Sequence, residues 1–250
     1  MHSNNPMLSR FGDAARATAA GSRADVMTIP GTATKAFILL MVLGFSAGLV
    51  WQQVAAGRVE LVTPAVMIGG IGGFIVAMVT VFKPHLAPWT APIYASLEGL
   101  LLGAISAMFN AAYKGVPQQA VLLTIGVAAG VFLLYHSRVV RATPGFRRML
   151  MSAMLGIVLF YVGSMILSFF GVQVSYFTSN GPLSIAINLF IVGVAAFSLV
   201  LDFDMIEQGA RSGAPKAMEW YSAFSLMITL VWLYLELLRL LSRFQGNNRS

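Results

Sequence analysis

The chain has 250 residues, of which 58% are hydrophobic and 10% are charged, with a formal net charge of +7 and no cysteine. Soluble domains carry about a quarter of charged residues, so this composition excludes a soluble fold and indicates a polytopic α-helical membrane protein. The lack of cysteine excludes disulfides, thiolate metal sites and cysteine nucleophiles. Because no basic run is interleaved with aromatic residues, we expect no nucleic-acid partner and assign the positive charge to membrane topology.

The beginning of the chain is polar, mildly basic and rich in Ala, Ser and Gly. It lacks the apolar core of a signal peptide. We therefore expect residues 1–33 to form a flexible cytoplasmic tail, with the first membrane helix acting as an uncleaved signal. The membrane domain is expected over residues 34–244, followed by a short C-terminal tail over 245–250.

Seven apolar segments follow, and each has a length suited to crossing a bilayer, which takes about 20 residues. They cover residues 35–52, 61–82, 89–113, 117–135, 148–170, 182–207 and 218–241. The loops between them are short, so the sequence predicts an all-α bundle of seven transmembrane helices. Two small-xxx-small spacings, Gly69–Gly73 and Gly99–Gly103, are interpreted as packing contacts that let helix backbones approach.

Basic residues are distributed unevenly between the two ends of such a bundle. With the N-terminus inside, the cytoplasmic side collects eleven Lys and Arg residues and the far side five. The excess of basic residues in cytoplasmic loops predicts an N-in, C-out protein. Three of the five far-side residues, Arg239, Arg243 and Arg249, argue against an outward C-terminus. A last helix that is re-entrant or returns inward is therefore the alternative.

Ionisable side chains inside apolar segments are costly and mark candidate functional positions. Three acids qualify: Glu98, Asp202 and Glu236. In a partly dry site a carboxylate can take up a proton near neutral pH, and its oxygens suit hard cations such as Ca²⁺. These acids predict a proton-sensitive gate on a cation path, with transient Ca²⁺ binding at Asp202 and no fixed metal site.

The helical period separates the three acids that end the sixth segment. Asp202 shares a face with Asn188, whereas Asp204 lies about 200° around the helix. We interpret Asp202 as part of an inward polar stripe, and Asp204 and Glu207 as the cytoplasmic edge. The seventh segment carries a similar stripe of Ser222, Ser225, Thr229, Trp232 and Glu236. Two facing stripes predict a water-filled or ion-accepting path; the alternative is that they form interhelical hydrogen bonds that hold the bundle. For the three acids of the sixth segment, the alternative is that they merely end the helix.

An enzymatic site is not predicted. The three histidines, His2, His85 and His136, lie in the tail or at helix ends, which suits interfacial positions rather than a buried metal centre. Neither G-x-S-x-G nor G-x-G-D occurs. We therefore expect a protein that is not an enzyme and needs no cofactor.

Two motifs are typical of one family. The third segment contains APIYASLEGLLLGAIS, from Ala91 to Ser106, and the sixth ends in LDFDMIE. Together with seven apolar segments, they resemble the Bax inhibitor family over about residues 35–244, and the start SNNPMLSRF resembles its bacterial branch. The resemblance implies a seven-helix fold with the last helix packed centrally, and a pH-sensitive Ca²⁺ leak in a bacterial inner membrane.

The same resemblance implies site residues. In the family, an aspartate of helix six shares a proton with an aspartate of helix seven; the first corresponds to Asp202, and Glu98 to the family's helix-three glutamate. One alignment of the seventh segment with the family places Thr229 at the position of the second aspartate. Another alignment places Glu236 at that position, but at 1.5 Å per residue Glu236 would lie some 20 Å along the helix from the level of Asp202. Glu219 is close enough in depth to Asp202 to stand in.

Two functions of different classes follow from these observations. The first is a pH-sensitive leak in the lipid bilayer, with Ca²⁺ or H⁺ as the transported or sensed ion. The second is a membrane-integrated regulator whose tail binds a partner such as a membrane quality-control protease, a role associated with some bacterial relatives.

Overall fold

The computed structural model describes residues 26–172, 174, 176 and 181–247, so the expected tail falls outside the described residues as far as residue 25. Within these residues the chain is helical and contains no β-strand. The elements are α2 (Ile29–Ala55), 3-10 turn η1 (Val59–Leu61), α3 (Val62–Met67), π-helical turn η2 (Ile68–Gly72), α4 (Gly73–Phe82), 3-10 turn η3 (Pro84–Leu86), α5 (Ala87–Ala112), α6 (Val116–His136), α7 (Pro144–Phe169), α9 (Pro182–Arg211) and α10 (Met218–Asn247).

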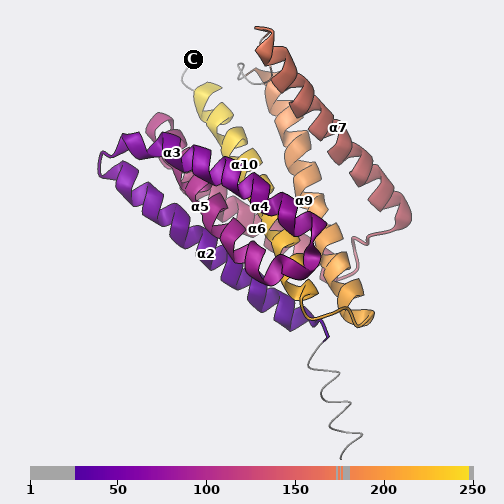
Figure 1. Ribbon diagram of the computed structural model, residues 1–250. Helices are drawn as coiled ribbons and strands as arrows, with labels where there is room; N and C mark the ends of the chain where they lie inside the picture. Colours follow the sequence, from indigo (N-terminus) through magenta and orange to yellow (C-terminus); the bar gives the residue numbers. More distant parts are fainter. Residues whose placement is uncertain (1–25, 173, 175, 177–180, 248–250) are drawn as a thin grey trace, which may run out of the picture.

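Seven stretches of the described chain are long and apolar enough to cross a membrane. They are Ile29–Ala55, Val59–Phe82, Pro84–Ala112, Val116–His136, Pro144–Phe169, Pro182–Arg211 and Met218–Asn247. This confirms the predicted all-α, seven-helix membrane fold. The start of α2 and the end of α10 lie at opposite ends of the bundle (Figure 1). Because α10 is one unbroken helix, the last span neither re-enters nor turns back.

The ends of the membrane domain differ from those expected. Thr28 caps α2, since its hydroxyl accepts a hydrogen bond from the Gly31 amide at 3.0 Å, and Pro30 suits the first helical turn. Residues 29–33, expected in the tail, are therefore the first turn of α2. At the other end, α10 continues to Asn247, beyond the expected ends of the seventh segment at 241 and of the membrane domain at 244.

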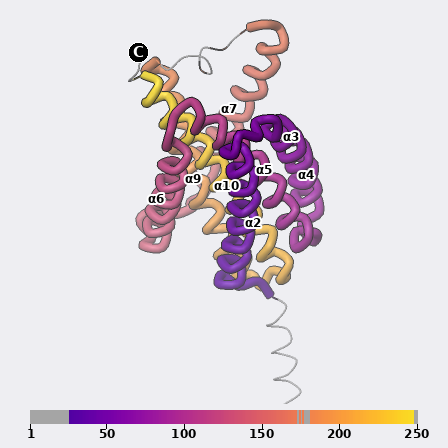
Figure 2. The backbone as a smooth tube through the Cα atoms, turned by 90° about the vertical axis from the view of Figure 1, so that its left-hand side faces the viewer, coloured from indigo at the N-terminus to yellow at the C-terminus, as the bar shows by residue number. Residues whose placement is uncertain are grey.

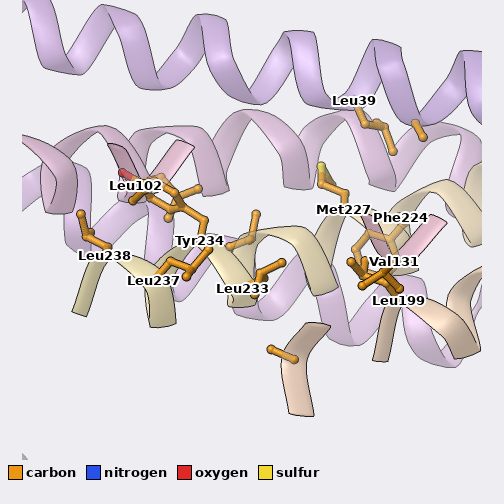
Figure 3. Close-up of a cluster of buried hydrophobic side chains, with 14 of the residues drawn as sticks. Leu39, Leu102, Val131, Leu199, Phe224, Met227, Leu233, Tyr234, Leu237 and Leu238 are labelled. Carbon is orange, nitrogen blue, oxygen red and sulfur yellow. The ribbon is translucent and has the colours of Figure 1, made fainter. Parts of the chain in front are cut away.

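The last helix occupies the centre of the bundle. α10 packs against α2, α5, α6 and α9 (Figure 2). Its buried apolar side chains face Leu39 of α2, Leu102 of α5, Val131 of α6 and Leu199 of α9 (Figure 3). The α10 side chains labelled in Figure 3 are Phe224, Met227, Leu233, Tyr234, Leu237 and Leu238. The outer helices are less enclosed: α7 packs on α9, and α3 and α4 pack on α5.

Glycines allow α5 to approach its neighbours closely. A Cβ atom at Gly99 would lie 2.4 Å from the Leu43 carbonyl oxygen of α2, and one at Gly103 would lie 2.5 Å from the Ala47 carbonyl oxygen. On the opposite side, a Cβ at Gly69 would lie 2.6 Å from the α5 backbone. Such separations exclude any side chain, so the packing role predicted from the small-xxx-small spacings is confirmed at these three positions.

Candidate functional site

The acids on the described helices α5, α9 and α10 divide by whether a basic side chain neutralises them. Four acids form ion pairs with Lys or Arg: Asp204, Glu207, Glu219 and Glu236. Asp202 and Glu98 are buried, as are Glu219 and Glu236, yet among the described residues neither Asp202 nor Glu98 forms an ion pair. Because an isolated buried charge is expensive, these two carboxylates are the ones whose charge state is least secured by the fold.

Asp202 lies between α9 and the central helix α10, with 6% of its surface exposed. The Ser225 hydroxyl donates a hydrogen bond to Oδ1 at 2.7 Å, and the Thr229 hydroxyl, one turn along α10, faces the same carboxylate. Oδ2 has no hydrogen-bond partner among the described residues. Thr229 therefore lies beside Asp202, and no other carboxylate is among the described groups that interact with Asp202.

Glu219 is held by α2 instead of by Asp202. It is fully buried and accepts hydrogen bonds of 2.9 Å from both the backbone amide and the hydroxyl of Thr28. Lys35 forms an ion pair with its other oxygen. Gly31 leaves the necessary space, since a Cβ there would lie 2.3 Å from Glu219 Oε1. The structure thus gives Glu219 a different partner from the one its depth suggests.

The segment that precedes α2 is fastened to the turn between α9 and α10. The Met27 amide donates a hydrogen bond to the Ala214 carbonyl at 2.7 Å, and the Met27 side chain is 2% exposed and packs against Gly209. We call Met27, Thr28, Lys35 and Glu219 the N-terminal clamp. It joins the beginning of the described chain to the base of the last helix.

Glu236 belongs to a second polar group nearer the other end of α10. Tyr161 donates a hydrogen bond to Oε1 at 2.7 Å, and the Asn188 amide donates one to Oε2 at 2.9 Å. Arg239 contacts both carboxylate oxygens at 3.1 Å. We call Tyr161, Asn188, Glu236 and Arg239 the Glu236 network. Asn188 shares a helix face with Asp202, but at 1.5 Å per residue it lies about 21 Å from it along α9.

Arg243 is a further interior group that sequence reasoning missed. It is 5% exposed, donates to the carbonyls of Ser184 and Tyr176 at 2.5 Å each, and stacks on the Tyr176 ring at 4.2 Å. Together with Arg239, it is one of the arginines that argued against an outward C-terminus. Both side chains form hydrogen bonds inside the bundle, so they are weaker evidence against an outward C-terminus. The three-residue spacing from Glu236 to Arg239 is a signal that could have revealed their ion pair.

Glu98 faces the interrupted helix formed by α3, η2 and α4. Its carboxylate interacts with the Tyr94 hydroxyl one turn earlier on α5, and its Oε2 would lie 3.4 Å from a Cβ at Gly73. The π-helical turn Ile68–Gly72 directly precedes this glycine, and such turns are frequent at functional sites. Tyr94 in turn packs edge-on against Phe224 of α10, with ring centroids 5.0 Å apart.

Asp204 and Glu207 are less buried than Asp202 and form ion pairs with arginines just after α6 and near the start of α7. Asp204 pairs with Arg147 at 2.8 Å. Glu207 pairs with Arg138 at 2.8 Å and accepts a hydrogen bond from Tyr135. The three acids of the LDFDMIE motif therefore have separate surroundings, with Asp202 alone facing α10.

The sequence matches one family model over nearly its whole length. The family model described as Bax inhibitor 1 like matches residues 5–246. The chain belongs to the Bax inhibitor 1 like family. No curated protein and no solved structure matches it.

The Asp202 site of this Bax inhibitor 1 like protein combines one carboxylate with two hydroxyls. Stable Ca²⁺ chelation takes about six to eight oxygen ligands. The described residues contain no cluster of three or more metal-ligating acids or histidines. The arrangement suits proton exchange or a brief contact with a passing cation.

Proposed function

We propose that this protein is a proton-sensitive leak for cations, with Ca²⁺ as the principal ion, in a bacterial inner membrane, with its N-terminus in the cytoplasm. Asp202 acts as the gating carboxylate. The observation that carries the proposal is its setting: a buried acid against the central helix which, within the part of the chain that the structure describes, has no basic partner and one oxygen without a hydrogen bond. Neither a cofactor nor a catalytic step is needed for this activity.

The packing between the two polar sites supports a closed conformation. Trp232, between Thr229 and Glu236 on α10, packs against two hydrophobic clusters, so the polar stripe of α10 is interrupted by apolar contacts. Cations can pass only when α9 and α10 separate locally. A charged Asp202 favours that separation, because it gains hydration and cation contacts that the closed bundle denies it.

Replacing Asp202 by asparagine tests the proposal in proteoliposomes with a Ca²⁺-sensitive dye inside. Wild-type flux is expected to increase with pH between about pH 5 and pH 8, because the ionised carboxylate attracts cations and its protonated form does not. Asp202→Asn is expected to be insensitive to pH and at least about tenfold slower at the upper end, which corresponds to only ~1.4 kcal/mol of lost barrier stabilisation.

Asp204→Asn is the matched control, because it removes a carboxylate two residues away that pairs with Arg147 at the bundle end. It is expected to retain the pH dependence. A wild-type protein that shows no flux at any pH or membrane potential would contradict the proposal, as would an Asp202→Asn variant with wild-type pH dependence.

The N-terminal clamp supports a second candidate, a regulator that binds a partner such as a membrane quality-control protease through its tail. A partner that pulls on the tail would act on the turn between α9 and α10, because Met27 is bonded to that turn. Deleting residues 1–25 separates the candidates while leaving Met27 and Thr28 in place. Under the leak proposal Ca²⁺ flux persists; under the regulator proposal co-purification with the protease is lost and flux is absent throughout.

A further inference from the structure

A cavity of about 470 Å³ opens between α2, α6 and α9, near the ends where α2 begins and α6 finishes. Its size lies within the range of ~300–1,000 Å³ that is usual for small-molecule sites. Most of its wall is apolar and comes from four helices: Ile29, Ala33, Phe132, Phe203, Ile206 and Leu226. Asp202 does not line it, so this cavity is distinct from the proposed gate.

The polar groups of the cavity are Thr32, Tyr135, His136, Arg138 and Glu207. Glu207 is shared by two guanidinium groups, those of Arg138 and Arg211. Two positive charges against one negative charge leave this rim with a net charge of +1. The Arg138 and Arg211 side chains are 48% and 68% exposed; Arg138 lines the cavity, and Arg211 is joined to the cavity wall through its ion pair with Glu207.

An apolar chamber with a cationic rim suits an amphiphile that has an anionic head. Apolar walls disfavour a free inorganic anion or a polar metabolite, whereas an acyl chain gains from burial against Phe132 and Phe203. In a membrane, anionic phospholipids supply both parts and are attracted to clustered Lys and Arg near the surface. We propose that this cavity binds one acyl chain of an anionic phospholipid, with the phosphate at Arg138 and Arg211.

The position of the cavity also connects such a lipid to the proposed gate. Phe203 directly follows Asp202, and Leu226 directly follows Ser225, the hydrogen-bond donor to Asp202. An acyl chain would therefore contact both helices beside the gating pair. This consequence rests on the proposed leak, but lipid binding itself does not, and the experiment measures binding.

Binding is measured by native mass spectrometry of the full chain in detergent, with phosphatidylglycerol or zwitterionic phosphatidylcholine added. Wild type is expected to retain phosphatidylglycerol preferentially. Ala33→Trp, which places an indole in the cavity, is expected to abolish this retention. Arg138→Gln is expected to weaken it about fivefold, the scale of one basic residue near an anionic lipid.

Two controls keep the result specific. Leu155→Trp adds an indole to an exposed position on α7, and Arg147→Gln breaks the ion pair with Asp204 at the same end of the bundle without touching the cavity. Both are expected to bind phosphatidylglycerol like wild type. The proposal is overturned if Ala33→Trp binds phosphatidylglycerol normally, or if phosphatidylcholine is retained equally well. Ca²⁺ flux does not enter this readout, so a failed leak proposal leaves the lipid result intact.

Discussion

Arg239→Gln is expected to lower the free energy of unfolding by about 3 kcal/mol, at the low end of the ~3–5 kcal/mol cost of breaking a buried ion pair. Glu236 is 2% exposed and would be left with the hydrogen bonds from Tyr161 and Asn188 but without its cationic partner. The low end applies because the Arg239 side chain is 31% exposed, so water can partly replace it. Thermal or denaturant unfolding in detergent measures the effect.

Combining this change with Glu236→Gln should recover much of the lost stability, because a neutral amide can still bond to Tyr161 and Asn188 without carrying a buried charge. Arg147→Gln removes a more exposed ion pair, that with Asp204, and should change stability by no more than about 1 kcal/mol. If Arg239→Gln unfolded like wild type, the Glu236 network would not be a buried charged site.

Thr229→Asp is expected to move the midpoint of the pH-dependent Ca²⁺ flux to higher pH by about one unit or more. The new carboxylate would face Asp202 across the contact that the Thr229 hydroxyl now makes. Two neighbouring carboxylates resist ionising together and share a proton, so the doubly charged, cation-attracting state forms at higher pH. Flux in proteoliposomes, recorded over a pH series, gives the midpoint.

Thr229→Asn is the control for this change, since it has the same shape as aspartate but cannot ionise. Its flux should titrate as in wild type, through Asp202 alone. Equal midpoints for the Asp and Asn variants would show that position 229 does not interact with the gating carboxylate. The comparison therefore tests the helix register as well as the chemistry.

Local patterns predicted the features that depend on one helix at a time. Hydropathy located the seven spans because each must cover the hydrocarbon thickness by itself. The helical period separated Asp202 from Asp204 because the two point in different directions along one axis. Glycine spacing indicated the close contacts of α5, since only a missing side chain permits that approach.

The remaining features depend on groups that are far apart in the chain. Periodicity placed Asn188 on the Asp202 face correctly, but depth along α9 assigns it to Glu236. Glu219 finds its counter-charge at Lys35, 184 positions earlier, and no local pattern indicates that pairing. The cavity between α2, α6 and α9 is also invisible in the sequence, because its walls meet only after the bundle has assembled.

The central place of α10 has a consequence for biogenesis. The helix that fills the middle of the bundle is synthesised after the other six spans, so α2, α5, α6 and α9 enter the membrane before the helix against which they pack exists. Until it arrives, Asp202 lacks Ser225, Lys35 lacks Glu219, and Leu39, Val131 and Leu199 have no apolar surface between them. A chain that stops before Met218 would therefore lack the helix against which α2, α5, α6 and α9 pack.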